Sequence, residues 1–303
     1  MESPKTGVTY LRAMGQASLI QPISNTLPIL AKTRLSESLP GIIGQAYAQR
    51  RIWEDTTREL YRAFVNSALV VPSDRFLAHP FIHKEDEYLG RKLTEDEAIE
   101  EAMGLAFAGS GTTATTILYI LYHLSRPENR AMQLRLREEL RLTGTKNSDI
   151  ADLKYLGAVI KEAMRLNPSL IGTLPRVLTT AIEAGRGKSK LVFPPGTLIS
   201  MQNYVHHRDP SVYADPHTFN PDRWLGVAQS SAVEKAFTPY SLGPRNCIGQ
   251  NLANLEIRLA VSHLFRHLDY RLNPKMKESE MDMEDRFAAL NRGGRLLLDV
   301  ARL

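Results

Sequence analysis

One thiol lies in a stretch whose residue types favour ligand chemistry. Cys247 is the only cysteine among 303 residues, and it belongs to the segment 237–253, FTPYSLGPRNCIGQNLA. A lone cysteine in a reducing compartment is usually a small buried hydrophobe. Here Gly243, Pro244 and Gly249 surround the thiol with a turn largely free of side chains, so that a flat ligand can approach the backbone closely. This context favours Cys247 as a ligand.

An apolar pattern with helical spacing follows the thiol. Leu252, Leu255 and Leu259 share one face of the predicted helix. Cys247 therefore precedes a helix N-terminus, where free N–H groups and the positive end of the helix dipole favour a thiolate over a thiol. Arg245 adds a cation that can pair with an anionic edge of a cofactor.

The residues around the thiol resemble the haem loop of cytochrome P-450 monooxygenases. The family pattern is F-x-x-G-x-R-x-C-x-G, and this chain has Tyr240, Gly243, Arg245, Cys247 and Gly249 at those positions. Tyr240 replaces the usual Phe and keeps an aromatic ring beside the sulfur. The resemblance implies that Cys247 is the axial thiolate ligand of the iron in haem b (iron protoporphyrin IX). Such a ligand pushes electron density onto iron and favours O–O cleavage.

Two glycines interrupt the longest predicted helix, which begins at a capping box, Thr94–Glu97, and ends near Ser125. Gly109 and Gly111 cost about 1 kcal/mol each relative to alanine within a helix. A helix accepts this cost where a group approaches the backbone or where it needs a local bulge. Close helix–helix packing through small residues is the alternative interpretation.

The glycine segment, AGSGTT, resembles the oxygen-binding groove A-G-x-[D/E]-T-T of the same family. Ala108, Gly109, Thr112 and Thr113 match, whereas Gly111 occupies the acidic position. In the family, the acid and the following Thr form a water relay that protonates dioxygen. The resemblance implies that Thr112 and its groove handle dioxygen, while the proton route differs. Thr112 is also expected to bond back to the carbonyl of residue 108.

A charged pair and a distant arginine complete the pattern. Glu162 and Arg165 share one face of a predicted helix, Leu153–Leu166, and exposed pairs of this kind contribute little. Arg223 belongs to the later sequence FNPDRW. These segments resemble the E-x-x-R helix and the P-x-R-W segment of the family. The resemblance implies a buried structural triad of Glu162, Arg165 and Arg223, in which loss of one member leaves the others unpaired.

The resemblance also assigns the remaining site residues. Arg176 and Arg245 would each hold a haem propionate, a task suited to bidentate arginine–carboxylate bonds. The segment Ser169–Leu174 would line the substrate pocket. Electrons would come from NADPH through a flavoprotein reductase, and the co-substrate would be dioxygen.

The fold class predicted is mainly α with a small β component, the cytochrome P-450 fold. Residues 91–303 form the expected haem-binding core, with short strands within Lys190–Ser200 and a short helix near Ser211–Tyr213. Residues 1–90 contain predicted helices at Leu11–Ile20 and Ala46–Val70. The apolar connection between them is either a surface crossing or a mobile substrate-channel lid that touches a membrane surface.

Other polar elements receive structural interpretations. Arg130–Arg141 reads as a charged amphipathic helix, a solvated surface element. His79 and His83 have metal-like spacing, but Pro80 is expected to break the helix, which leaves both histidines in a loop. His263 and His267 share the last helix without an evident third ligand, so that a structural role is expected.

Composition narrows the class of partner. The formal net charge is +5 and the basic residues are scattered, which excludes nucleic acid as an inference and suits an acidic protein partner. A single cysteine excludes a disulfide framework and fits a cytosol-facing protein.

Ala102–Leu124 is long enough to span a membrane, yet its glycines and threonines favour a buried core helix. Neither a signal peptide nor an anchor is evident near Met1. The family resemblance places such a chain on the cytosolic face of the endoplasmic reticulum, with peripheral membrane contact.

Family members are usually longer at the N-terminus. We therefore expect the chain to be the C-terminal portion of the fold, with the anchor, most of the larger sheet and one haem-gripping helix missing. A haem held by this portion alone would be partly exposed.

The predicted function is insertion of one oxygen atom from dioxygen into a lipophilic small molecule. The motifs resemble those of fungal microsomal members, many of which tailor secondary metabolites. The missing acid at Gly111 leaves open a haem-thiolate rearrangement or dehydration, and the short chain leaves open a catalytically silent haem-binding remnant.

Overall fold

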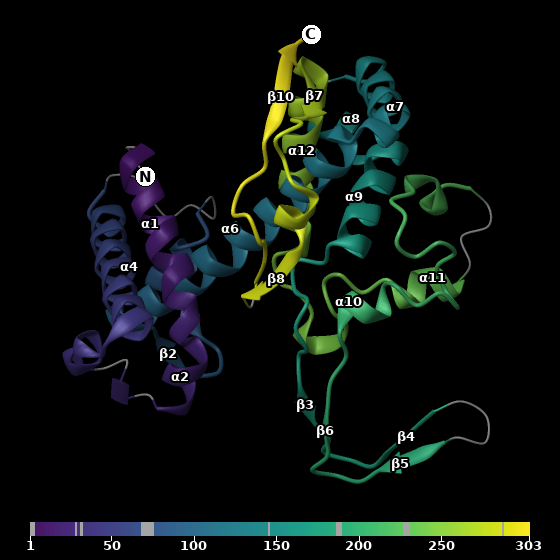
Figure 1. Ribbon diagram of the computed structural model, residues 1–303. Helices are drawn as coiled ribbons and strands as arrows, with labels where there is room; N and C mark the ends of the chain where they lie inside the picture. Colours follow the sequence, from purple (N-terminus) through teal and green to yellow (C-terminus); the bar gives the residue numbers. More distant parts are fainter. Residues whose placement is uncertain are drawn as a thin grey trace. The chain divides into compact units, whose positions relative to one another are not determined.

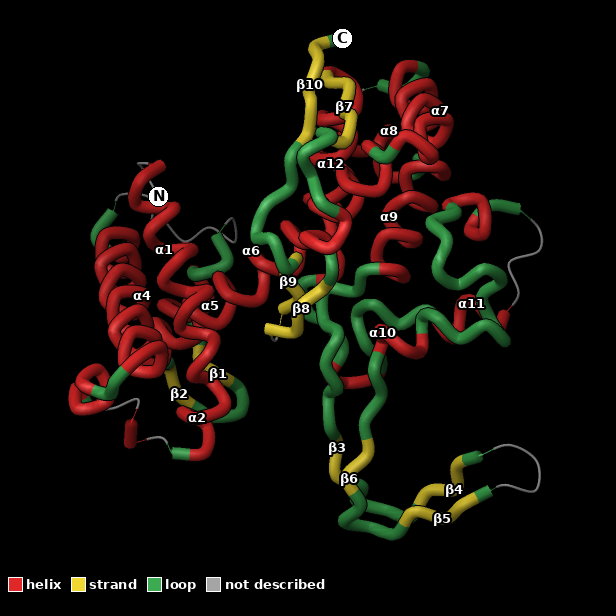
Figure 2. Tube along the Cα trace, viewed as in Figure 1, coloured by secondary structure: helices red, strands yellow, loops and turns green. Residues whose placement is uncertain are grey.

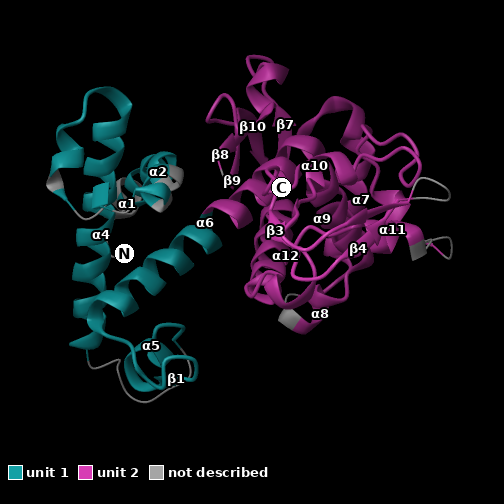
Figure 3. Cartoon of the chain, turned by 90° about the horizontal axis from the view of Figure 1, so that it is seen from below, with its two compact units in different colours: residues 1–110 teal, residues 111–303 magenta. Residues whose placement is uncertain are grey.

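The computed structural model describes residues 4–27, 29–30, 33–67, 76–144, 146–185, 190–226, 231–286 and 288–303. The chain divides into two compact units, Met1–Ser110 and Gly111–Leu303 (Figure 3). The border falls within one helix, α6 (Glu95–Ser125). Two predicted segments lie partly outside the described residues. They are the end of the helix predicted at Ala46–Val70 and the apolar connection before that helix.

The first unit is helical. It contains α1 (Pro4–Ala17), α2 (Gln21–Thr26), α4 (Gly41–Val65) and α5 (His79–His83), with a small ribbon of β1 (Glu85–Asp86) and β2 (Arg91–Lys92). The helices α1 and α4 pack on each other and on the start of α6, because each presents an apolar stripe. The core side chains of this packing are Tyr10, Ala13, Met14, Ala17, Trp53, Ile99 and Met103.

The predicted capping box begins α6. The Thr94 N–H donates to Glu97 Oε2 at 2.8 Å, and the Glu97 N–H donates to Thr94 Oγ1 at 3.3 Å. These reciprocal bonds satisfy two backbone donors that a helix N-terminus otherwise leaves unpaired. The helix then runs without interruption through the glycine segment to Ser125, the predicted end.

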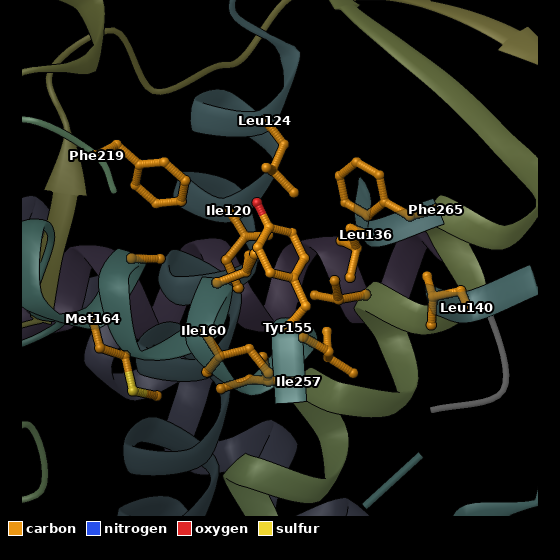
Figure 4. Close-up of a cluster of buried hydrophobic side chains, with 14 of the residues drawn as sticks. Ile120, Leu124, Leu136, Leu140, Tyr155, Ile160, Met164, Phe219, Ile257 and Phe265 are labelled. Atoms are coloured by element: carbon orange, nitrogen blue, oxygen red, sulfur yellow. The ribbon is translucent and has the colours of Figure 1, made fainter. Parts of the chain in front are cut away.

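The second unit has its core between helices. It contains α7 (Arg130–Arg141), α8 (Asn147–Ala151), α9 (Lys154–Leu166) and α12 (Gln250–His267), which pack against one another (Figure 1). Their buried apolar side chains meet those of the second half of α6 in one cluster (Figure 4). Labelled members are Ile120, Leu124, Leu136, Leu140, Tyr155, Ile160, Met164, Phe219, Ile257 and Phe265.

The helix α7 is amphipathic, as predicted, with an exposed face that carries Glu138 and Arg141 and a buried face that packs in the core. Leu136 and Leu140 are fully buried, and the Glu139 carboxylate accepts the backbone N–H groups of Tyr155 and Leu156 at 2.8 and 2.9 Å. A carboxylate at a helix N-terminus satisfies unpaired donors and interacts favourably with the helix dipole. Glu139, one of the two glutamates in the charged pattern of α7, therefore caps α9.

Strands form only short antiparallel ribbons in the described part of the chain (Figure 2). The pairs are β3 (Arg176–Val177) with β6 (Leu198–Ile199), β4 (Ile182–Ala184) with β5 (Leu191–Phe193), β7 (Leu268–Leu272) with β10 (Leu298–Arg302), and β8 (Met283–Arg286) with β9 (Ala288–Asn291). The fold is thus mainly helical with a small β component, as predicted.

The short helix expected at Ser211–Tyr213 is a turn instead. Asp209 Oδ1 accepts the Ser211 N–H at 2.8 Å, and the Asp209 carbonyl accepts the N–H groups of Val212 and Tyr213. An aspartate side chain that bonds two residues ahead favours such a turn. The helical residues lie earlier, in α10 (Asn203–His206), and α11 (Ser231–Ala236) follows later.

Among the described residues, α6 is the one helix long and apolar enough to cross a membrane. Its side chains Ile99 and Met103 belong to the core of the first unit, and Ile120 and Leu124 to the core of the second. This packing favours a core helix.

Candidate haem-thiolate site

The cysteine loop is closed by its own backbone. The Cys247 N–H donates to the Tyr240 carbonyl at 2.9 Å, and the Asn246 N–H donates to the Gly243 carbonyl at 3.0 Å. Gly243 has φ of +75°, a conformation that residues with a Cβ rarely adopt, so glycine is required at this turn. The loop presents the Cys247 thiol exposed to solvent.

The thiol stands at the N-terminus of α12, as predicted. Gly249 is the residue before the first helical turn, and the Cys247 carbonyl accepts the Gln250 N–H at 3.4 Å. A Cβ added at Gly249 would lie 4.0 Å from the Cys247 sulfur, which is ordinary contact. Ile257, Val261 and Phe265 bury one face of the helix, whereas Leu252 and Leu255 remain exposed.

Tyr240 is anchored to the same helix. Its hydroxyl donates to Asn254 Oδ1 at 3.2 Å. Burial, and secondly the charge of Cys247, raises the pKa of Tyr240 to about 12, so the phenol stays protonated and can donate. The hydroxyl that distinguishes Tyr240 from the usual Phe thus has a partner on α12. Sequence reasoning missed Asn254, because nothing in the spacing links it to the loop.

The two arginines assigned to the haem carboxylates are exposed. Arg176 donates to the carbonyls of Leu174 and Pro175, at 3.2 and 3.0 Å. Arg245 has no carboxylate partner among the described residues, and neither has Arg176. Cations on an exposed surface without protein carboxylates fit an anionic ligand.

The structure brings Glu162, Arg165 and Arg223 together. Arg165 donates to both carboxylate oxygens of Glu162, at 2.8 and 2.9 Å, and Arg223 Nε donates to Glu162 Oε1 at 2.9 Å. The side chains of Glu162 and Arg165 are fully buried. Trp224 Nε1 and the Asn220 N–H also donate to the carboxylate, two contacts that the sequence patterns did not indicate. The Arg165 guanidinium further satisfies the carbonyls of His207, Pro216 and Thr218.

The glycine segment of α6 crosses the border between the units. Ala108 and Gly109 belong to the first unit, and Thr112 and Thr113 to the second. No atom lies within 4 Å of a Cβ built at Gly109 other than its own helix backbone and chain neighbours. At Gly111 the nearest such atom is Ala288 Cβ, at 3.7 Å. Within the described residues neither added Cβ would make a close contact. The ligand groove and the close-packing alternative both stay predictions.

The histidine pairs do not form a metal centre in the described part of the chain, where no group of three potential ligands occurs. The prediction that His79 and His83 lie in a loop is wrong, because both belong to α5, with ring centroids 4.5 Å apart. Pro80 occupies the first turn, where its missing N–H has no helical partner to lose. His263 and His267 lie together on α12, as expected.

A cavity of about 280 Å³ lies between the loop, α9 and α12. Its walls include Phe237, Tyr240, Gln250, Asn254 and Arg258 but neither Cys247 nor an arginine assigned to haem. The lining of this cavity therefore does not include the thiol.

Solved structures share the fold of this chain. The retinoic acid-bound cyanobacterial CYP120A1 superposes with a TM-score of 0.78 at 21% sequence identity, over 100% of this chain and 64% of that one. The heme domain of cytochrome P450DA superposes with a TM-score of 0.76 at 18% identity, over 97% of this chain and 61% of that one. These likenesses establish a P450 fold.

Sequence comparison establishes the family. The Cytochrome P450 family model matches residues 11–298, so the chain belongs to the cytochrome P450 family. The Cytochrome P450 monooxygenase hkm5 of Aspergillus hancockii is 36% identical over 216 residues, which are 68% of this chain and 40% of that protein. The mitochondrial 25-hydroxyvitamin D-1 alpha hydroxylase of Mus musculus is 30% identical over 90% of this chain and 53% of its own length. The chain thus spans about half the length of such relatives, or less.

Proposed function

We propose that the chain acts as a haem-thiolate monooxygenase that inserts one oxygen atom from dioxygen into a lipophilic small molecule. The observation that carries this proposal is the exposed Cys247 thiol, held by a closed backbone loop at the N-terminus of α12. Cysteine sulfur at this position is a suitable donor atom for iron, and the exposed loop leaves it accessible to a bound haem.

The surface near the thiol fits haem b. Leu242, Ile248 and Leu252 are exposed, and an apolar macrocycle laid on this surface would remove apolar area from water. Arg176 and Arg245 are available for the propionates. When bound to the Cys247 thiolate, haem supplies the iron chemistry that activates dioxygen.

The residues of α6 take the role of dioxygen handling in this proposal. Gly109 leaves the helix backbone open to approach, and Thr112 supplies a hydroxyl in the same segment. Since Gly111 carries no acid, a proton must travel through hydroxyl groups and water at Thr112.

The relatives suggest a setting for this reaction. The monooxygenases hkm5 of Aspergillus hancockii and claJ of Penicillium crustosum are fungal proteins, the latter 33% identical over 66% of this chain. We propose a secondary-metabolite pathway on the cytosolic face of the endoplasmic reticulum, with electrons from NADPH through a flavoprotein reductase. Residues 1–90 are proposed to act as a mobile substrate-channel lid, and residues 91–303 as the haem-binding core.

A reconstituted reaction tests the proposal. The haem-loaded chain, a flavoprotein reductase and NADPH are incubated with a library of lipophilic natural products under isotopically labelled dioxygen. We expect a product that carries one labelled oxygen atom and that is absent with Cys247→Ala. Haem uptake without any labelled product would contradict the proposal.

A second candidate function is a haem-thiolate rearrangement or dehydration, favoured by the glycine at position 111. Such a reaction would proceed without dioxygen and reductase. A chain that binds haem and shows neither reaction would be a catalytically silent remnant.

A further inference from the structure

Two hydroxyl groups converge on one carbonyl of α6. The Thr112 carbonyl accepts a hydrogen bond from Ser169 Oγ at 2.9 Å and another from Thr116 Oγ1 at 3.2 Å. The two hydroxyl oxygens are 3.0 Å apart, so that either one can donate to the other. We call Thr116, Ser169 and the Thr112 carbonyl the hydroxyl cluster.

The hydroxyl cluster contains two O–H donors, whereas one donor is enough to satisfy the Thr112 carbonyl. Each hydroxyl carries one proton and two acceptor lone pairs. When one hydroxyl donates to the Thr112 carbonyl, the other is free to rotate and donate to a water molecule, and the two roles can exchange. Thr116 is buried and Ser169 is half-buried, so the pair leads from the interior towards solvent.

The cluster lies beside the position that lacks an acid. Gly111 precedes Thr112, and a Cβ added at Gly111 would meet Ala288 of β9 at 3.7 Å. The Ala289 N–H donates to the Ser169 carbonyl at 2.8 Å. The strand β9, the segment at Ser169 and α6 therefore meet at this point, where the hydroxyls of Thr116 and Ser169 bond to the Thr112 carbonyl.

We propose that Ser169 and Thr116 replace the missing carboxyl group at position 111 by holding a water molecule beside Thr112. As the reductase supplies electrons, this water passes a proton to dioxygen and takes a proton from one hydroxyl. The second hydroxyl then reprotonates the first, and solvent water reprotonates the second. The cluster then ends with the protons it began with. Ser169 and Thr116 are positioning residues in this scheme, which rests on the proposed haem-dependent function.

Carbon monoxide bound to the reduced haem provides a probe of this water. A hydrogen bond to the bound carbon monoxide changes its infrared stretching frequency, and a band component that depends on exchangeable protons shifts in deuterium oxide. The variants are Ser169→Ala and Thr116→Val, with Ser169→Thr and Thr116→Ser as conservative rescues. Thr115→Val is the matched control, because Thr115 is a buried neighbour whose hydroxyl donates to the Ala289 carbonyl at 2.9 Å, outside the cluster.

We expect the wild-type chain to show a deuterium-sensitive component that both Ser169→Ala and Thr116→Val lose. The two rescues and Thr115→Val should keep it. Three results would overturn the inference while leaving haem binding intact. The deuterium-sensitive component could be unchanged in both variants, it could be lost equally in Thr115→Val, or it could be absent from the wild type. Failure of the wild-type chain to take up haem would overturn the proposed function and this inference together, which distinguishes the two failures.

Discussion

At the scale of single residues, Glu162 is the side chain on which the polar interior of the second unit depends. Its two carboxylate oxygens accept bonds from Arg165, Arg223, Trp224 and the Asn220 backbone. A buried charge is tolerated when its partners compensate for lost hydration, and removal of one partner leaves the others uncompensated. The triad therefore acts as one unit.

We expect Glu162→Gln to lower the free energy of unfolding by about 3–5 kcal/mol, because it leaves the buried Arg165 cation unpaired. Urea unfolding followed by circular dichroism measures the change. The matched control is Glu138→Gln, which breaks an exposed pair with Arg141 at the same spacing and should cost less than about 1 kcal/mol. Equal costs for the two variants would show that the triad is not a buried unit.

A half-buried histidine, His123, gives the second unit a predicted pH dependence. His123 Nε2 lies 2.7 Å from Asn167 Oδ1, and its ring stacks on Phe219. Burial lowers the pKa of His123 to about 4, against an ordinary value of 6.5. Below pH 6.5 the unfolded chain binds a proton that the folded chain does not, so stability falls as the pH is lowered towards 4.

Between pH 7 and pH 5, titration of His123 is expected to lower the free energy of unfolding by about 2 kcal/mol. Urea unfolding at both pH values measures it, with His123→Gln as the non-titrating reference. The loss in the wild type should exceed the loss in the variant by that amount. The same loss in both proteins would mean that His123 titrates normally in the folded state.

The sequence could predict the pairing of Glu162 with Arg165, since i, i+3 spacing on a helix brings them together. The donors Trp224 and Asn220 lie about 60 residues further along the chain, at separations of 62 and 58 residues from Glu162. Local spacing carries no information about how a loop of that length closes. Only the fold could identify these contacts.

At the scale of elements, α6 has three glycines, Gly104, Gly109 and Gly111, where helix stability favours alanine. Gly104 and Gly109 both have open surroundings for a Cβ. The cost of glycine within a helix is therefore not offset by close packing in the described residues. A groove that a ligand approaches would explain Gly109, whereas Gly104 lies outside the groove motif.

We expect Gly109→Ala and Gly104→Ala each to raise the free energy of unfolding by about 1 kcal/mol. Only Gly109→Ala should slow the binding of carbon monoxide to the reduced haem-loaded chain, because the added methyl group would narrow the groove. Urea unfolding and stopped-flow absorbance measure the two effects. Equal binding rates in both variants would argue against a ligand groove at Gly109.

Element boundaries followed from local signals where those signals were strong. The capping box fixed the start of α6, and the apolar period located α9 and α12. The capping role of Glu139 could not be predicted, because charge pattern alone does not distinguish a solvated glutamate from one that caps a neighbouring helix. The error at His79 arose because proline was taken as a helix breaker, although it is compatible with the first turn.

At the scale of the whole molecule, the chain belongs to the cytochrome P450 family and spans 40% of the length of hkm5. Its second unit has a continuous core and a fully formed cysteine loop, with Arg176 and Arg245 in the same unit. We therefore predict that this chain holds the haem iron through Cys247.

The most direct test is a carbon monoxide difference spectrum of the reduced, haem-loaded 303-residue chain. Cys247→Ala removes the proposed ligand, and Tyr240→Phe, which restores the usual family residue, is the matched control. We predict a red-shifted, thiolate-type Soret band in the wild type and in Tyr240→Phe, and its loss in Cys247→Ala. A wild-type chain without haem uptake, or with a band typical of a protonated thiol, would contradict the central claim.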